Sequence, residues 1–324
     1  MIKISQKQKK AVVVGGANLD IKGYTKNYIR YSSSPGWIEE STGGVARNIA
    51  EDLALLAQDA LLLTAVADDH HGDLIRRKTT AAGVNLEEIK ILSSDKFSTG
   101  RYLAHLNKAG ELMGAVADMS ILKEINLKYL QSKKNLIKAC SMLILDTNIE
   151  AESIDYLLKI TKNDKINILI DAVSAEKSLK LKSKLKKIDY LRANLDEAEV
   201  IFGIKDIKKE LAENKAIVER IKKLFKAYAE HETSAEVIIS VGVNGSYLFS
   251  KKTKKAISKY FPAEKIAEKN LKESTGAGDA LTAGIAAGLM NEMGIEEAIE
   301  LGIKAASLTI ESNYSSNPKI AELI

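Results

Sequence analysis

Cysteine, aromatic residues and long apolar runs are scarce in this chain. Cys140 is the single cysteine among 324 residues, which excludes an internal disulfide and a cysteine-ligated zinc or iron–sulfur site. No apolar run is long enough to span a bilayer, and the opening MIKISQKQKK lacks the apolar core of a secretory signal. One tryptophan and five phenylalanines offer no stacking platform for RNA. We therefore expect a cytoplasmic protein with neither a membrane nor a nucleic-acid partner.

Several motifs of nucleotide-binding proteins and hydrolases are also missing. The sequence contains no G-x-x-x-x-G-K-[ST], no H-E-x-x-H and no G-x-S-x-G. The turn Gly15-Gly16-Ala17-Asn18 lacks G-x-G-x-x-G, so a dinucleotide site is weakly supported. The net charge of +5 comes mostly from scattered lysines, and the run KKTKK (251–255) is interpreted as a solvated surface rather than a polyanion site.

Apolar runs alternate with helical patterns along most of the chain. Continuous apolar strands separated by helices indicate a largely parallel sheet with helices on both faces. We expect one α/β domain over residues 1–324, with a helical last third. The expected strands are 11–16, 60–66, 141–146, 166–171, 190–194 and 236–242, and the expected helices are 44–58, 151–162, 195–203, 207–230, 277–290 and 295–311.

Residues 20–42 and 97–118 break this rhythm. Both resemble short, partly exposed strands, and HLNKAGELM indicates a hairpin around Lys108-Ala109-Gly110. They are either surface loops or a small accessory sheet that covers a pocket. Because ligands of open α/β sheets bind beyond the carboxyl ends of the strands, we favour the lid.

The stretch STGAGDALTAG (274–284) combines glycines, a helix start and one acid. Ser274 and Thr275 are candidate N-caps, and Gly276 and Gly278 let an anion approach the unpaired amides of the helix N-terminus. Asp279 either complements the helix dipole or takes the proton of a hydroxyl held beside a phosphate. The combination of glycines, a helix start and an acid favours the role of Asp279 as a base.

Two further polar clusters point to a pocket. Gly43 and Gly44 precede a helix whose start carries Asn48, and Asn18 and Asp20 follow the first strand. Each cluster alone is explained by a turn, a helix cap or an Asx turn. Together with the phosphate site they indicate groups that grip sugar hydroxyls.

The sequence resembles the ribokinase-like (PfkB) family of carbohydrate and nucleoside kinases. GGVARN (43–48) is similar to the family's G-G-x-x-x-N signature, and STGAGD (274–279) is similar to its D-x-x-G-A-G-D signature. The resemblance spans essentially the whole chain. It implies a ribokinase-like fold with a small β lid, and phosphoryl transfer from ATP with Mg²⁺.

The resemblance also implies roles for individual residues. Asp279 matches the catalytic base. NLDE matches the N-x-x-E that organises magnesium largely through water, although Asn194 and Glu197 also fit a helix capping box. The remaining positions are the anion hole (Gly276, Ala277, Gly278), the acceptor site (Asn18, Asp20, Gly43, Gly44, Asn48) and the ATP site in SVGVNG (Ser240, Gly242, Gly245).

Two positions depart from the family pattern. Glu273 stands where Asp is common, near a loop that binds a monovalent cation in many members, so a potassium requirement stays open. Arg192-Ala193 replace a frequent Lys-Pro, and we expect no change of function from this. The family's lid often serves as a dimer clasp, which implies a homodimer.

The identity of the acceptor is inferred from resemblance alone. GGANLDIKGY, ILIDAVSAEK and ESNYSSNP are similar to the pseudouridine-phosphorylating members of the family, which implies transfer to the ribose 5′-hydroxyl, with Asn148 and lid residues as candidate base contacts. The alternatives are another sugar or nucleoside kinase, such as a ribokinase or fructokinase, and a non-catalytic sugar- or nucleotide-binding regulator. An NAD-dependent oxidoreductase is a weaker alternative. The intact set of Asp279 and its glycines favours an enzyme.

Overall fold

A central sheet of eight strands runs through the computed structural model, which describes residues 10–162, 164–204, 213–251, 255–267, 270–272 and 275–324. The strand order is β14-β13-β12-β11-β10-β9-β1-β4. The strands are β1 (Lys10–Val14), β4 (Asp59–Leu63), β9 (Met142–Asp146), β10 (Asn167–Asp171), β11 (Tyr190–Asn194), β12 (Glu236–Ser240), β13 (Ser246–Ser250) and β14 (Ile257–Phe261). All neighbours from β4 to β12 pair in parallel, which confirms the predicted sheet.

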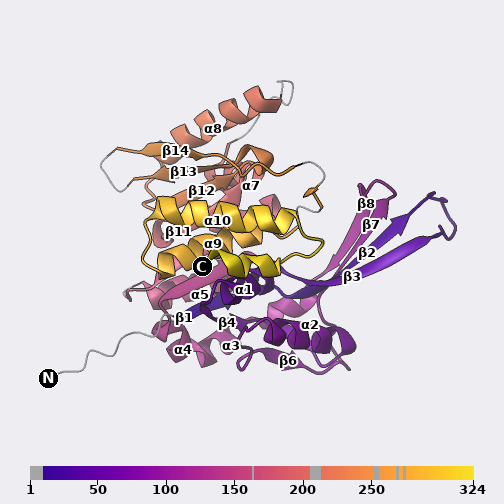
Figure 1. Cartoon of the computed structure of the whole chain (residues 1–324). Helices are drawn as coiled ribbons and strands as arrows, with labels where there is room; N and C mark the ends of the chain where they lie inside the picture. Colours follow the sequence, from indigo (N-terminus) through magenta and orange to yellow (C-terminus); the bar gives the residue numbers. More distant parts are fainter. Residues whose placement is uncertain (1–9, 163, 205–212, 252–254, 268–269, 273–274) are drawn as a thin grey trace.

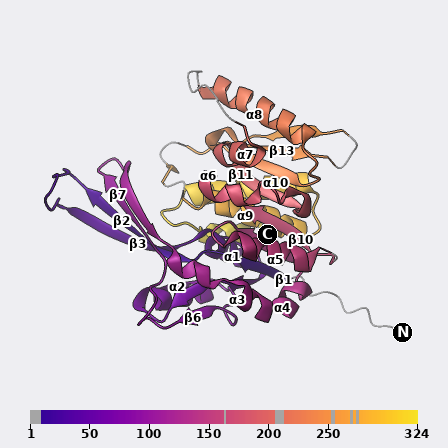
Figure 2. The same ribbon diagram turned by 180° about the vertical axis from the view of Figure 1, so that it is seen from behind.

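Helices cover both faces of this sheet, as Figures 1 and 2 show from opposite sides. One face packs against α1 (Val45–Leu55), α9 (Ala277–Met290) and α10 (Ile295–Ile310). The other packs against α3 (Leu127–Ser132), α4 (Lys134–Ala139), α5 (Ala151–Thr161), α7 (Leu195–Phe202) and α8 (Glu213–Glu230). The central strands are mostly apolar, as expected for strands with both faces buried, and their polar residues lie mainly at or near the strand ends.

A smaller four-stranded sheet projects from the body beside α2 (His70–Ala81) (Figure 1). Its order is β3-β2-β7-β8, built from β2 (Asn18–Thr25), β3 (Gly36–Gly43), β7 (Arg101–Asn107) and β8 (Leu112–Asp118). The hairpin between β7 and β8 turns at Gly110, whose φ of 82° favours glycine. Residues 20–42 and 97–118 therefore form an accessory sheet and not irregular loops.

Two predictions about strands need correction. The expected strand 60–66 is divided between β4 and the short β5 (Ala65–Ala67), which pairs with β6 (Lys90–Leu92) in a separate sheet. The last third is not purely helical, because β13 and β14 add antiparallel strands at the sheet edge. No helix in the described part of the chain is both long and apolar enough to cross a membrane.

Helix α9 is fixed by an unusually close crossing with α10. A Cβ added at Gly284 would lie 2.5 Å from the Cα of Gly302, and one added at Gly288 would lie 2.8 Å from the Cα of Ala298. The small residues that the sequence places in α9 therefore let two backbones approach, and the helix is buried over nearly its whole length. This packing sets the position of the α9 N-terminus, where the candidate site begins.

Candidate active site

The N-terminus of α9 presents free amides to the carboxyl ends of the central strands. The first helical bond is donated by the amide of Ala280 to the carbonyl of Gly276, so the preceding amides of the first turn have no partner within the helix. Gly276 is the N-cap, with φ of 87° and no side-chain cap, which corrects the expected cap Thr275; the other candidate, Ser274, lies outside the described residues. A Cβ at Gly276 would lie 2.8 Å from the carbonyl carbon of Ser315, so only glycine fits.

Asp279 lies in this first turn and is 8% exposed. Its Oδ2 accepts a hydrogen bond of 2.8 Å from Nδ2 of Asn48 in α1. Burial raises the pKa of Asp279 to about 8; the charge of Asp171 acts in the same direction, while the Asn48 bond and Arg192 oppose it. A carboxyl group tuned toward the working pH is suited to exchange a proton with a bound hydroxyl.

The acceptor residues form a second cluster against Asp279. Nδ2 of Asn18 donates to Oδ1 of Asp20 at 2.7 Å, and both residues lie in β2 and not in an Asx turn. A Cβ at Gly43 would lie 2.8 Å from Cγ of Asp20, so the glycine leaves room for that carboxylate. Gly44 has a φ of 102° where β3 turns into α1. The structure thus brings the predicted acceptor residues together.

Asn48 is held in place by Arg47. Nη1 of Arg47 donates to Oδ1 of Asn48 at 3.0 Å, which fixes the amide so that its nitrogen faces Asp279. Arg47 itself is 3% exposed and also bonds the carbonyl of Thr42. The single contact from Asn48 to Asp279 therefore joins the acceptor cluster to the start of α9.

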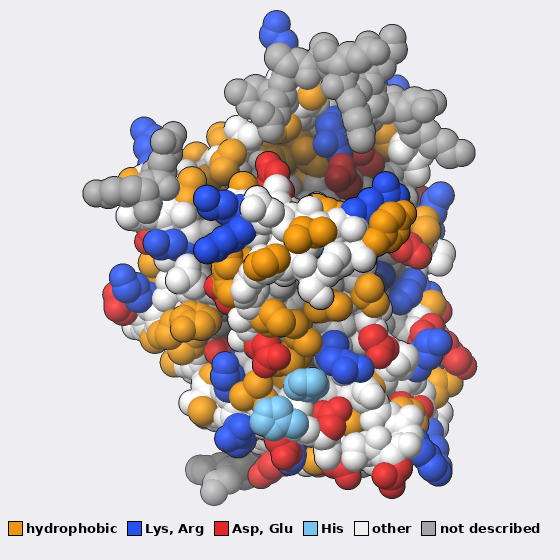
Figure 3. Space-filling view, turned by 90° about the vertical axis from the view of Figure 1, so that its right-hand side faces the viewer, with side chains coloured by type: hydrophobic (Ala, Val, Ile, Leu, Met, Phe, Trp, Pro, Cys, Tyr) orange, Lys and Arg blue, Asp and Glu red, His pale blue; other side chains and the backbone are white. Residues whose placement is uncertain are grey.

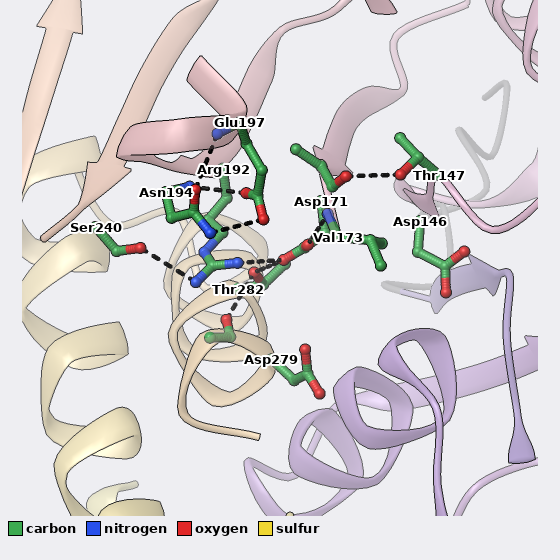
Figure 4. Close-up of polar contacts among 12 residues, drawn as sticks. Asp146, Thr147, Asp171, Val173, Arg192, Asn194, Glu197, Ser240, Asp279 and Thr282 are labelled. Atoms are coloured by element: carbon green, nitrogen blue, oxygen red, sulfur yellow. Dashed lines mark hydrogen bonds and ion pairs between the residues drawn. The ribbon is translucent and has the colours of Figure 1, made fainter. Parts of the chain in front are cut away.

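Two buried acids that the sequence analysis did not single out end neighbouring strands. Asp146 ends β9 and accepts hydrogen bonds from the amides of Gly16 (2.8 Å) and Ala46 (3.0 Å). Asp171 ends β10 and accepts from the hydroxyl of Thr282 at 2.7 Å. Both residues lie in the close-up of Figure 4. The signal was present in the sequence, because SMLILD and INILID each close a buried strand with an acid.

The residues assigned to ATP and magnesium lie on the other side of Asp171. Ser240 ends β12, and Gly242 and Gly245, both with positive φ, flank the turn that follows. Asn194 and Glu197 form a complete capping box at the start of α7, with Oε2 of Glu197 2.8 Å from the Asn194 amide. Burial raises the pKa of Glu197, opposed by the charge of Arg192.

The capping box limits how this pair meets a metal ion. Oε1 of Glu197 accepts from Nδ2 of Asn194 (2.8 Å), and Oδ1 of Asn194 accepts from the Glu197 amide (2.9 Å). Mg²⁺ prefers oxygen ligands and retains several waters. These side chains therefore fit a magnesium ion reached through water. Within the part of the chain that the structure describes, no group of three His, Cys, Asp or Glu side chains is arranged to hold a metal. Glu273 lies outside the described residues.

The chain belongs to the pfkB carbohydrate kinase family, whose model matches residues 8–322. Membership makes it an ATP-dependent phosphotransferase acting on a sugar or a nucleoside, and it confirms the resemblance seen in the two signatures. Among curated relatives, pseudouridine kinase of Escherichia coli (strain K12) is 30% identical over 311 residues, covering 96% of this chain and 93% of that protein.

Solved structures confirm the ribokinase-like fold. A carbohydrate kinase from Agrobacterium tumefaciens superimposes with a TM-score of 0.75 at 25% identity, covering 97% of this chain and 96% of the other. Ribokinase from Arabidopsis thaliana, determined with ribose and ATP, gives a TM-score of 0.77 at 21% identity, covering 97% and 98%. The second likeness shows the fold alone.

Proposed function

We propose that this protein transfers the γ-phosphate of ATP to the ribose 5′-hydroxyl of pseudouridine, giving pseudouridine 5′-phosphate and ADP. The observation that carries the kinase chemistry is the 2.8 Å hydrogen bond from Asn48 to Asp279. This bond joins the carboxyl group at the start of a small-residue helix to the cluster suited to sugar hydroxyls, which supports Asp279 as the base.

The reaction follows from this placement. Asp20 and Asn48 hold the ribose hydroxyls, and Asp279 takes the proton of the 5′-hydroxyl. The 5′-oxygen forms a bond to the γ-phosphorus while the bond from that phosphorus to the β–γ bridging oxygen breaks, and ADP leaves. The amides around Gly276, Ala277 and Gly278 face the charge on the transferring phosphate.

ATP and magnesium take the C-terminal side of the site in this proposal. Ser240, Gly242 and Gly245 contact the nucleotide, and the glycines let the backbone approach it closely. Mg²⁺, when bound, neutralises charge on the phosphates, and Asn194 and Glu197 order its waters.

Support for pseudouridine comes from the E. coli relative, which aligns over 96% of this chain. Asn148 is our candidate base contact: Nζ of Lys177 donates to its Oδ1 at 2.6 Å, which directs the amide nitrogen toward Gly16. A ring with several N–H and C=O groups gives such an oriented amide a partner. A free sugar is the alternative acceptor, because the chain belongs to a family of carbohydrate kinases.

A coupled ADP-release assay with Mg·ATP tests the acceptor, using pseudouridine, uridine, adenosine, ribose and fructose. We expect turnover on pseudouridine and little on uridine. Because the two nucleosides differ only in how the base is attached, this result would place the specificity in the contacts to the base. Turnover on ribose or fructose would overturn the acceptor and keep the chemistry. No turnover with any acceptor, in folded protein that binds ATP, would favour a non-catalytic regulator.

The base is tested by Asp279→Asn, which keeps the shape of the side chain and its contact with Asn48. We expect ATP binding to persist and kcat to fall by about 10²–10⁴-fold, the usual contribution of a general base. Asp95→Asn, at an exposed position, is the matched control. Unchanged turnover in Asp279→Asn would remove Asp279 as the base.

We also propose that the small sheet closes over the acceptor and joins two copies of the chain. One face carries an apolar row: Leu103 and Val116 lie opposite each other on β7 and β8, and Ile38 of β3 shares their face. Ile38 and Val116 are 70% and 65% exposed. Figure 3 views the molecule from the side of the projecting sheet and shows apolar side chains gathered among charged ones.

Covering this row in a dimer would remove exposed apolar area from water. We expect a dimer by light scattering, and a monomer for Val116→Glu, with Leu179→Glu as an exposed apolar control outside the sheet. A wild-type monomer at micromolar concentration would refute the clasp. A cytoplasmic location completes the proposal and suits a chain whose single cysteine, Cys140, is buried and has no second cysteine for an internal disulfide.

A further inference from the structure

We propose that Arg192 is a catalytic residue that contacts the γ-phosphate and stabilises its charge during transfer. This inference rests on the proposed kinase chemistry but not on the identity of the acceptor. Sequence comparison gave Arg192 no role beyond replacing a lysine, whereas the structure places it beside the anion hole.

Arg192 lies directly against the first turn of α9. A Cβ added at Gly278 would lie 2.8 Å from Cζ of Arg192, so the glycine is required for the guanidinium to occupy this place. Figure 4 shows the side chain extending from β11 between Ser240 and Asp171, above the turn that carries Asp279. A cation here stands beside the amides that would receive a phosphate.

The guanidinium is aimed by neighbours on both sides. Asp171 lies opposite Arg192 in the register of β10 and β11, and its Oδ2 is 3.4 Å from Nη1. Nη2 donates to the hydroxyl of Ser240 at 3.2 Å. Asp171 is anchored in turn by Thr282. The residue is thus held between the predicted ATP site and the start of α9.

These contacts leave much of the hydrogen-bonding capacity of the guanidinium unused. Arginine has five N–H donors in a planar fork, and strong structural pairs with a carboxylate are short and bidentate. The contact to Asp171 is single and long, and Nε is buried without a hydrogen-bond partner among the described residues. The fork therefore retains donors for the equatorial oxygens of a phosphate.

A structural role is the competing explanation. Arg192 could serve only to neutralise Asp171 and pack against Gly278. In that case its loss would lower stability and weaken ATP and ADP binding alike. A γ-phosphate contact affects ATP and leaves ADP nearly untouched, because ADP lacks the γ-phosphate. Nucleotide discrimination therefore separates the two roles.

The test compares Arg192→Met and Arg192→Lys with Arg220→Met. Arg220 lies on α8 and pairs with Glu199, so it controls for the loss of a partly buried, paired arginine. Affinities for Mg·ATP and Mg·ADP are measured by calorimetry without an acceptor, and kcat is measured with pseudouridine. Thermal unfolding is recorded for each variant.

We expect Arg192→Met to lower kcat by about 10³-fold, the lower end of what arginine contributes in other phosphoryl transfers. We expect its ATP affinity to fall about tenfold while its ADP affinity stays within about twofold. Arg220→Met should change neither. Equal weakening of ATP and ADP, or an unchanged kcat, would overturn the proposal.

Arg192→Lys covers the case in which the Met variant does not fold. Lysine keeps the charge beside Asp171 but lacks the fork, so we expect kcat and the preference for ATP over ADP each to fall by about fivefold or more. Unchanged values in a folded Lys variant would overturn the proposal. Failure of the wild type to bind ATP would instead overturn the proposed function, and absent turnover on pseudouridine alone would leave the nucleotide comparison valid.

Discussion

The buried carboxyl group of Asp279 makes a quantitative prediction about stability. In the unfolded chain its pKa is near the ordinary value of 3.8, and in the folded protein burial, aided by the charge of Asp171, raises the pKa to about 8. The folded state therefore holds this proton more tightly than the unfolded state. The stabilising contribution is complete below pH 3.8 and is lost as the pH rises through 8.

Asp279→Asn removes the titrating group, so the free energies of unfolding of variant and wild type should diverge as the pH rises. Between the two pKa values the wild type loses about 1.4 kcal/mol per pH unit. Because the pKa of Asp279 is about 8, the difference should widen by roughly 3 kcal/mol between pH 6 and pH 9 and should level off above the pKa.

Urea unfolding at pH 6, 7, 8 and 9 measures this difference directly. The variant should be the more stable protein at every one of these pH values, although it has lost its activity. Asp95→Asn, at an exposed position, should follow the wild type throughout. Parallel curves for Asp279→Asn and wild type would show that Asp279 does not hold a proton in the folded state, and the reasoning from burial would be wrong.

Two further predictions concern the same site. In a pH–rate profile, the acidic limb of kcat/KM should have its midpoint near the Asp279 pKa of about 8, because the base acts only when ionised. The variant Asp171→Asn removes a charge that raises this pKa, so its midpoint should lie at lower pH. A midpoint that stays in place would separate the limb from Asp279. Gly276→Ala should weaken ATP binding and lower stability by at least about 1 kcal/mol in urea unfolding, because φ is 87° and the new Cβ would meet Ser315; wild-type stability and affinity would contradict the tight approach at this turn.

Much of the fold could be predicted because buried parallel strands have largely continuous apolar sequences. Helices α9 and α10 were also visible, the first with its observed bounds. Strands β13 and β14 were not predicted. Strand β14 is exposed along most of its length and its sequence, ISKYF, lacks a continuous apolar run, whereas β13 is buried but has only the short apolar run YLF between two serines. An edge strand forms because it hydrogen-bonds to the adjacent strand, and a single sequence does not show which strand will be adjacent.

The candidate site divides in the same way. Glycine-rich turns and helix starts marked Asp279, Asn48 and Asp20 because their local chemistry is unusual. Asp171 and Arg192 were missed as site residues because their position depends on the register of two strands, 21 residues apart in the chain. The sequence offered one signal, a polar residue at or near the end of a buried strand. This signal does not predict which residue the polar side chain will contact.

The hydrogen bond between Asn48 and Asp279 spans 231 positions of sequence. On one side of it lie β2, β3 and α1, which supply the groups suited to an acceptor. On the other lie β10, β11, β12 and α9, which supply the groups suited to the phosphate. Because α9 is locked against α10 through glycine, the second set has little freedom to adjust to changes in the first. A change in the groups of β2, β3 and α1 would therefore leave the N-terminus of α9 where its packing against α10 holds it.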